Sequence, residues 1–190
     1  MADQVTVKLP DGSTREYPAG VTPGEVAASI GRRLADAAVA ASVDGVTVDL
    51  DRPITADAEL AIVTGDSPDG LYVLRHSTAH VLAQAVLDLF PGARYAIGPP
   101  ITDGFYYDFE LPAHPDGSPA HFTEGDLERI DTRMREIIGE AQPFVREEMD
   151  KAAGLELFAD QPFKREIIEG AESTEGAEAG VVSVYRNPKR

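Results

Sequence analysis

Apolar and polar residues alternate in several short segments of residues 1–66, which is the pattern of half-buried β-strands. The run Val-Thr-Val-Lys-Leu at 5–9 leads into a turn at 10–13, and Asp44-Gly45 joins two further alternating runs. An Asp-Gly pair favours the type I′ turn, whose twist matches that of the flanking strands. The predicted strands lie at 5–9, 14–17, 40–43, 46–48 and 60–63.

One amphipathic helix is predicted between these hairpins. Thr22, Pro23 and Glu25 supply an N-cap hydroxyl, a proline at the first helical position and the acid of a capping box. The predicted buried face consists of Val26, Ala27, Ile30 and Leu34. Two hairpins around one helix predict a small mixed sheet of the β-grasp type at 1–66. The polar stretch 64–70, rich in glycine and proline, marks a boundary before a second domain at 67–190.

Residues 67–190 mix helical and strand patterns, so we predict the α+β class for this domain and for the whole chain. Helices are expected at 71–90 and from Thr123, where Asp126 completes a second capping box. The apolar stripe of the second helix is Leu127, Ile130, Met134, Ile137 and Ile138. The antiparallel sheet is expected from strands at 104–110, 144–149, 164–168 and 181–185, with a short helix from Asp150 to Phe158 and an acidic loop at 170–180.

Composition excludes several classes of function. The 190 residues include no cysteine, which rules out disulfides, a thiolate nucleophile, iron–sulfur clusters and cysteine-containing zinc sites. No apolar run reaches the roughly 18 to 20 residues that cross a bilayer, and no signal peptide is recognisable, so we expect a cytoplasmic protein with no membrane partner. The formal net charge of −16 is a common solubility trait, and it predicts weak binding of this chain alone to nucleic acid, with no DNA partner.

His76 and His80 are the strongest candidates for chemistry. They stand four residues apart in a predicted helix, so their Cβ atoms lie on one face about 6 Å apart, and the two imidazoles can share a water or a metal. Two solvent-facing histidines are the alternative that this spacing leaves open. Two imidazoles fall short of an ordinary zinc site, and we predict no tightly bound zinc. Ser77 points about 100° away from His76, which makes a nucleophilic dyad a poor interpretation.

Tyr107 and Lys164 are weaker candidates on pattern alone. Tyr107 shares one face of the predicted 104–110 strand with Phe105 and Phe109, so we expect a buried ring, and an ordinary core tyrosine explains that equally well. Lys164 begins the predicted 164–168 strand, where alternation leaves its direction open and a solvated lysine is the default.

The motifs, taken in order, resemble a known enzyme family. Residues 7–13, together with the β-grasp pattern, resemble the TGS domain. The sequence Arg-His-Ser-Thr-Ala-His at 75–80, followed by Ala-Ile-Gly-Pro at 96–99 and Gly-Phe-Tyr-Tyr-Asp at 104–108, resembles the second additional domain of threonyl- and alanyl-tRNA synthetases, which edits mischarged tRNA. The two modules in this order are similar to the N-terminal part of bacterial threonyl-tRNA synthetases, over essentially the whole chain.

The resemblance implies a function and a site. The family attaches threonine to its tRNA with ATP, and its editing domain hydrolyses serine that was attached in error. By match of motif, His76 and His80 are the first half of an editing site that orients or activates the hydrolytic water. Tyr107 and Lys164 correspond to pocket residues that position the aminoacyl group and the terminal adenosine.

Departures from the family pattern limit what this chain is expected to do. In the family, an Asp-x-Cys-Arg-Gly-Pro-His segment follows the strand matched by 181–185, whereas here residues 186–190 end the chain. The ligase domain, to which ATP, zinc and most dimer contacts belong, is also missing, so no cofactor is expected in this chain. We therefore expect the front part of a longer enzyme, unable to aminoacylate alone, with tRNA(Thr) as partner in the full-length context. The alternatives are a non-catalytic TGS-type binding or regulatory module and a freestanding deacylase acting on seryl-tRNA.

Overall fold

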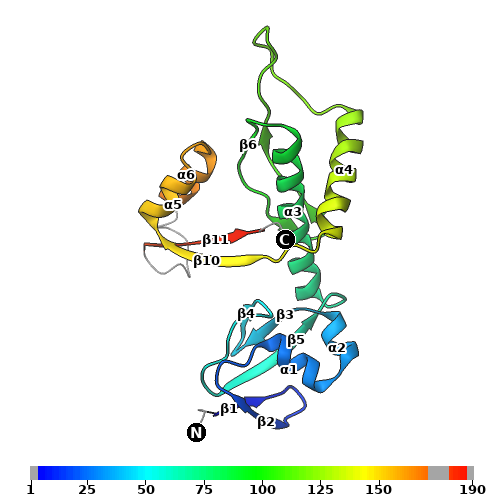
Figure 1. The fold of residues 1–190 in the computed structure, drawn as a ribbon, viewed down its shortest axis with the longest axis vertical. Coiled ribbons are helices and arrows are strands. Elements are labelled where there is room, and N and C mark those ends of the chain that lie inside the picture. The colour runs from blue at the N-terminus through cyan, green and yellow to red at the C-terminus, as the bar shows by residue number, and fades with distance from the viewer. Residues whose placement is uncertain (1–3, 171–179, 188–190) are drawn as a thin grey trace. The chain divides into compact units, whose positions relative to one another are not determined.

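The structure is a computed structural model that describes residues 4–170 and 180–187. The chain divides into two compact units, Met1–Arg75 and His76–Arg190, and helix α3 (Pro68–Leu89) runs through the division (Figure 1). The acidic loop predicted at 170–180 falls almost entirely outside the described residues. None of the helices in the described ranges is both long and apolar enough to span a membrane.

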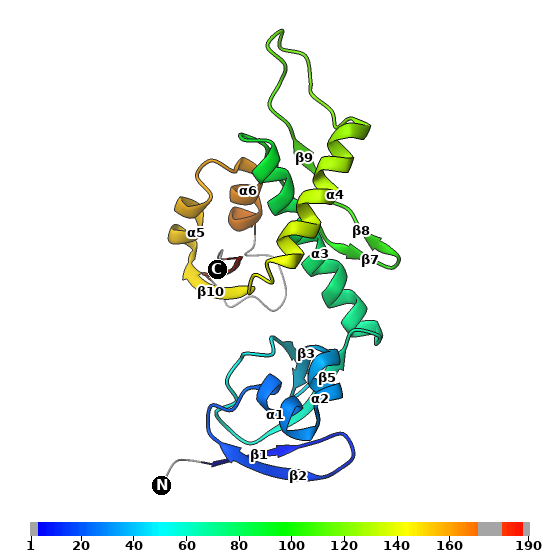
Figure 2. The same ribbon diagram turned by 45° about the vertical axis from the view of Figure 1, so that its right-hand side comes forward.

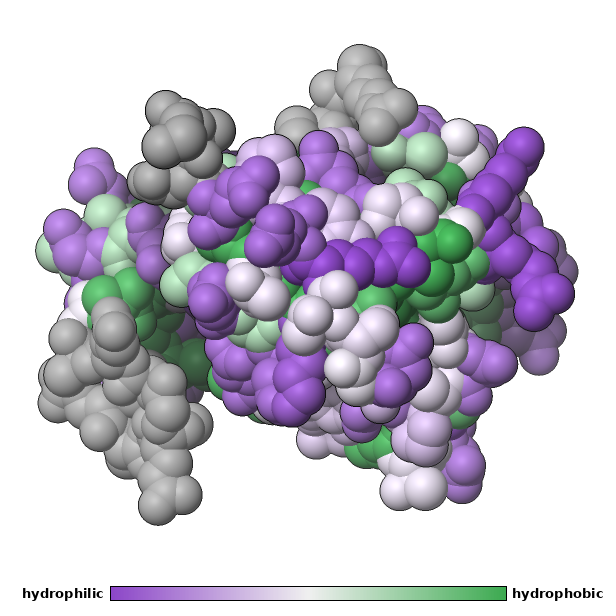
Figure 3. Space-filling model, turned by 90° about the horizontal axis from the view of Figure 1, so that it is seen from below, coloured by the Kyte–Doolittle hydropathy of each residue, from purple (hydrophilic) through white to green (hydrophobic). Residues whose placement is uncertain are grey.

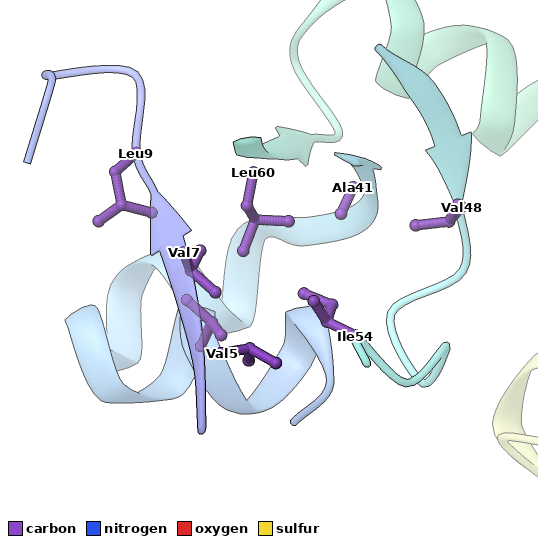
Figure 4. Close-up of a cluster of buried hydrophobic side chains, with 8 residues drawn as sticks. Val5, Val7, Leu9, Ala41, Val48, Ile54 and Leu60 are labelled. Carbon is purple, nitrogen blue, oxygen red and sulfur yellow. The ribbon is translucent and has the colours of Figure 1, made fainter. Parts of the chain in front are cut away.

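The first unit is built on a five-stranded sheet. The strands are β1 (Gln4–Lys8), β2 (Thr14–Pro18), β3 (Ala38–Val43), β4 (Val46–Val48) and β5 (Ala58–Thr64), in the order β2-β1-β5-β3-β4. Strands β1 and β5 pair in parallel, and the other pairs are antiparallel. Helices α1 (Pro23–Ile30) and α2 (Arg32–Ala37) follow the first hairpin. Side chains from separate strands meet in one core, formed by Val5, Val7, Leu9, Val26, Ala41, Val48, Ile54 and Leu60 (Figure 4).

Local sequence signals set the ends of these elements. The Thr22 side chain accepts a hydrogen bond from the Glu25 backbone N–H, and the Glu25 carboxylate accepts one from the Thr22 backbone N–H, so the predicted capping box is confirmed. Asp44 and Gly45 have φ values of 51° and 82°, as the predicted type I′ turn requires. The predicted buried face was wrong at its end: α1 stops before Gly31, which leaves Ile30 38% exposed and places Leu34 in α2.

The core of the second unit lies between α3 and α4 (Glu124–Gly139). Its buried members are Val81, Ala85, Val86, Ala93, Ile130 and Ile137. The capping box of Thr123 and Asp126 is confirmed. Two residues of the predicted stripe were placed wrongly, since Leu127 and Ile138 are 56% and 61% exposed. A stripe of five positions is wider than the face of α4 that α3 and its neighbours cover.

The strands of the second unit form three separate pairs, which confirms the α+β class but divides the expected sheet. The pairs are β6 (Arg94–Tyr95) with β9 (Phe109–Glu110), β7 (Pro100–Ile101) with β8 (Gly104–Phe105), and β10 (Val145–Asp150) with β11 (Val181–Arg186), all antiparallel. The predicted 104–110 strand is thus two short strands with different partners. The predicted alternation of buried and exposed side chains is present, because Tyr107 and Phe109 are half-buried while Tyr106 and Glu110 are exposed.

The segment predicted as a strand at 164–168 is part of a helix. Helix α5 (Lys151–Leu157) is capped by Asp150, as predicted, and contacts β10 and β11. It is followed by α6 (Pro162–Gly170), which contacts α5 and β6 (Figure 2). Proline at the first helical position favours a helix start, and Lys164 and Ile168 are one helical turn apart. Ile168 is buried, which anchors α6 and fixes the face on which Lys164 stands.

Hydrophilic side chains cover much of the molecular face drawn in Figure 3, with smaller apolar areas between them. Ion pairs account for part of this surface. Arg133 of α4 binds Asp88, Glu136 and Glu140, at 2.8, 2.8 and 3.2 Å. The contact with Asp88 joins α4 to α3 across the core of the second unit.

Candidate functional site

Two histidines of α3 lie side by side at the centre of the candidate site. The ring centroids of His76 and His80 are 4.8 Å apart, with an angle of 31° between the ring planes. His80 is half-buried, with Phe144 and Tyr185 at ring-centroid distances of 6.1 and 6.2 Å, whereas His76 is more exposed. The helix therefore presents a pair of imidazoles with one open edge.

Both histidines favour the neutral form. Burial lowers the pKa of His80 to about 4, and the charges of His76 and Lys164 add to the effect. Burial and the Lys164 charge also lower the pKa of His76. A neutral imidazole has a free nitrogen lone pair, so at pH 7 each ring can accept a hydrogen bond from a water molecule.

Lys164 of α6 is held against two tyrosine rings and is half-buried, contrary to the default expectation of a solvated lysine. Its Nζ atom lies 5.0 Å from the ring centroid of Tyr95 and 6.0 Å from that of Tyr107. These distances fall within the range of cation–π attraction. Burial lowers the pKa of the Lys164 ammonium, and its charge is felt by both histidines. All four residues singled out in the sequence therefore gather in one site.

The Tyr107 ring packs on a glycine. It stacks on Phe109 at 4.9 Å, and a Cβ atom added to Gly98 would lie only 2.1 Å from the ring. Backbone hydrogen bonds from Ala96 to Asp108 and from Asp108 to Ile97 hold the two segments together. The Gly-Pro-Pro loop thus supplies a flat surface for the tyrosine. Burial raises the pKa of Tyr107, which keeps its phenol neutral.

Two residues that the sequence analysis missed, Tyr95 and Gln84, also belong to this region, as does Gly98 of the 96–99 motif, to which the sequence assigned no role. Gln84 stands one turn beyond His80 on α3. Its side chain donates to Gln142 Oε1 and accepts from Asn187 Nδ2, both at 3.0 Å. Gln142 precedes β10 and Asn187 follows β11, so both bonds fasten the same end of the β10–β11 pair to α3. A polar residue at four-residue spacing after the pair was the only available signal for Gln84.

Comparison with known proteins agrees with the family resemblance. Residues 5–64 match the TGS domain family. The chain is 49% identical over 164 residues to the threonine--tRNA ligase of Rubrobacter xylanophilus, which covers 86% of this chain and 25% of the relative. It is 46% identical to that of Rhodospirillum rubrum, covering 96% of this chain and 27% of the relative, and 41% identical to that of Enterococcus faecalis, covering 95% and 26%. The chain is homologous to threonine--tRNA ligases.

The candidate site lies inside the region shared with the ligases. A match over 96% of the chain necessarily includes His76, His80, Tyr107 and Lys164. The site lies outside the TGS match, which ends at residue 64. The chain spans about a quarter of the length of these ligases, so it corresponds to one part of such an enzyme.

Among the described residues of this ligase homologue, no group of three or more histidine, aspartate or glutamate side chains is arranged to hold a metal ion. The histidine pair offers two nitrogen ligands, and the positive charge of Lys164 acts on both rings. That donor set fits an organic substrate and a water better than a zinc ion. Absence of tight zinc binding remains a prediction, and equilibrium dialysis with zinc tests it.

Proposed function

We propose that residues 67–190 remove serine from mischarged tRNA(Thr) as the editing domain of a longer threonyl-tRNA synthetase. The observation that carries the proposal is the neutral His76–His80 pair beside Lys164, in a chain homologous to threonine--tRNA ligases. Serine is smaller than threonine and retains the hydroxyl group, so a threonine site cannot reject it strongly. A separate hydrolytic step is then needed for accuracy.

The arrangement supports ester hydrolysis by a general base. The oxygen of a water held by His76 and His80 attacks the seryl carbonyl carbon, and its proton passes to an imidazole. The bond between that carbon and the ribose oxygen breaks, the ribose oxygen takes up the proton, and serine and tRNA are released. Lys164 favours the negative charge that develops on the carbonyl oxygen. Tyr107 and Lys164 position the aminoacyl group and the terminal adenosine.

In this proposal, threonine is attached to the tRNA by the rest of the ligase, the three quarters of its length that this chain does not cover. ATP and zinc would bind there, and so would most of the tRNA. The net charge of −16 supports this division, because phosphate groups are repelled by an acidic chain.

The test measures release of serine from Ser-tRNA(Thr). We expect the full-length enzyme that contains this chain to hydrolyse the ester, and His80→Ala to slow hydrolysis by about 10²-fold or more, the usual contribution of a general base. His114→Ala and His121→Ala are matched controls, because both residues are exposed and lie between β9 and α4. Equal rates in His80→Ala and the controls would contradict the proposal.

A second candidate function rests on the match of residues 5–64 to the TGS domain. In this alternative the chain is a non-catalytic binding or regulatory module. Two results together favour this alternative. The chain captures a partner with an affinity that His76→Ala and His80→Ala leave unchanged, and the full-length enzyme shows no histidine-dependent hydrolysis. Histidine-dependent release of serine by the 190-residue chain alone favours instead a freestanding deacylase.

A further inference from the structure

Helix α6 is tied to strand β6 through the side chain of Gln161, a residue with no role in the chemistry described above. Gln161 occupies the N-cap position of α6, and its backbone carbonyl accepts the first helical hydrogen bond, from Arg165, at 3.1 Å. Its side chain reaches β6: Oε1 accepts from the backbone N–H of Tyr95 at 3.2 Å, and Nε2 donates to the carbonyl of Ala93, just before the strand, at 3.4 Å.

Tyr95 contacts both Gln161 and Lys164 of this helix. Its backbone binds Gln161, and its ring lies 5.0 Å below the ammonium of Lys164. Gln161 and Lys164 are three residues apart, which places them on neighbouring positions of the first turn of α6. The amide of Gln161 therefore fixes the turn from which Lys164 projects, and the Tyr95 ring fixes where its ammonium comes to lie.

A lysine needs such support to remain in this place. Its four-carbon side chain loses rotamer freedom when it is held in one position, and an unrestrained ammonium extends into water. Here the ammonium stays half-buried, close enough to oppose protonation of His76 and His80. Among the described residues, the ionisable groups that interact with it include the two histidines of α3, Tyr95 of β6 and Tyr107 of the segment between β8 and β9.

We propose that Gln161 and Tyr95 are positioning residues, which hold the Lys164 ammonium against the tyrosine rings where it faces the histidine pair. This role rests on the proposed function only in that the site served is the editing site. Neither residue touches the reacting atoms. Both act through Lys164.

NMR titration of the 190-residue chain tests the proposal without any tRNA substrate. The probes are the ¹³Cε resonance of Lys164 and the imidazole ¹⁵N resonances of His76 and His80. Gln161→Met keeps the side-chain length and removes both hydrogen bonds. We expect the Lys164 titration midpoint to rise, because the ammonium moves into water, and the His80 midpoint to rise because a nearby positive charge has left. A rise of about half a pH unit corresponds to a threefold change in proton affinity.

A pair of variants at Tyr95 keeps the test decisive if Gln161→Met fails to fold. Tyr95→Phe retains the ring and should leave all three midpoints unchanged, whereas Tyr95→Leu should raise those of Lys164 and His80. Glu166→Ala, an exposed position of the same helix, is the control. Unchanged midpoints in the folded Gln161→Met and Tyr95→Leu proteins would overturn the proposal. Midpoints that respond as expected, together with no serine release by the unsubstituted full-length enzyme, would instead count against the proposed function alone.

Discussion

Replacing Gly98 by alanine is the most direct structural test of the candidate site. The new Cβ atom would lie 2.1, 2.4 and 2.7 Å from three carbons of the Tyr107 ring. Since close contacts begin near 3.4 Å, the ring must retreat by at least about 1.3 Å. That movement takes Tyr107 out of its stack with Phe109 and alters its contact with Lys164.

The expected cost follows from the packing of the second unit. Overfilling a packed site by one methyl group costs about 1 to 3 kcal/mol. In a chain of this length each kcal/mol lowers the melting temperature by about 2 to 4 °C. Gly98 does not have a positive φ, so the penalty comes from the clash with the ring rather than from backbone strain. The chain has six tyrosines and no tryptophan, so near-UV circular dichroism reports the tyrosine environment directly.

A double-mutant cycle separates this clash from other effects of alanine. We expect Gly98→Ala to destabilise the wild-type chain and to cost almost nothing in a Tyr107→Ala background, where no ring is present to collide. Gly139→Ala is the control, because nothing lies within 4 Å of the added Cβ at the end of α4. An equal loss of stability in both backgrounds would refute the packing argument.

Two further predictions concern charge. Because the pKa of His80 falls from 6.5 unfolded to about 4 folded, the unfolded state binds more protons between these values, and stability should decrease as pH falls from 6.5 towards 4. Allowing for partial exposure, His80 contributes about 1 to 2 kcal/mol of this loss. Urea unfolding at pH 7 and 4.5 should therefore show a larger loss of stability in the wild type than in His80→Gln, and equal losses would contradict the prediction. Arg133→Met should lower the melting temperature more than Arg135→Met, because Arg133 binds three carboxylates and Arg135 one, and equal melting temperatures would contradict this.

Signals confined to a few neighbouring residues were predicted well. The capping boxes at Thr22 and Thr123 and the Asp44-Gly45 turn are satisfied within four residues of chain, so the sequence contains the whole interaction. The histidine pair belongs to the same category, because helical geometry alone brings His76 next to His80. The spacing of the two histidines did not predict whether their side chains would be solvated or half-buried.

Interactions between distant segments were not predictable in this way. The α6 segment was assigned to a strand because five residues of mixed character fit both periodicities, and the helix-start signal of Pro162 was overlooked. Because of that error, the half-buried position of Lys164 on α6 was not predicted. The contacts of Gln161 with Ala93 and Tyr95 join residues 68 and 66 positions apart, and no local pattern marks them. Gly98 belongs to the Ala-Ile-Gly-Pro motif, but the absence of a side chain at this position matters only because Tyr107, nine residues away, packs against it.

The candidate site has a local charge opposite to that of the chain around it. Lys164 presents one positive charge to two neutral histidines, while the chain as a whole carries −16. At low salt the net charge of the chain acts over a Debye length of about 10 Å or more, so it governs the approach of a polyanion. A single half-buried charge acts instead on the bound ester.

We therefore expect the chain alone to bind tRNA weakly at any salt concentration. In the full-length enzyme the salt dependence of serine release should follow from phosphate contacts outside residues 1–190, because those contacts displace the condensed counterions. Lys164→Gln should then lower the rate of hydrolysis at saturating tRNA without changing the slope of binding against salt. A reduced slope in that variant would place Lys164 on the phosphate backbone and remove it from the chemistry of the ester.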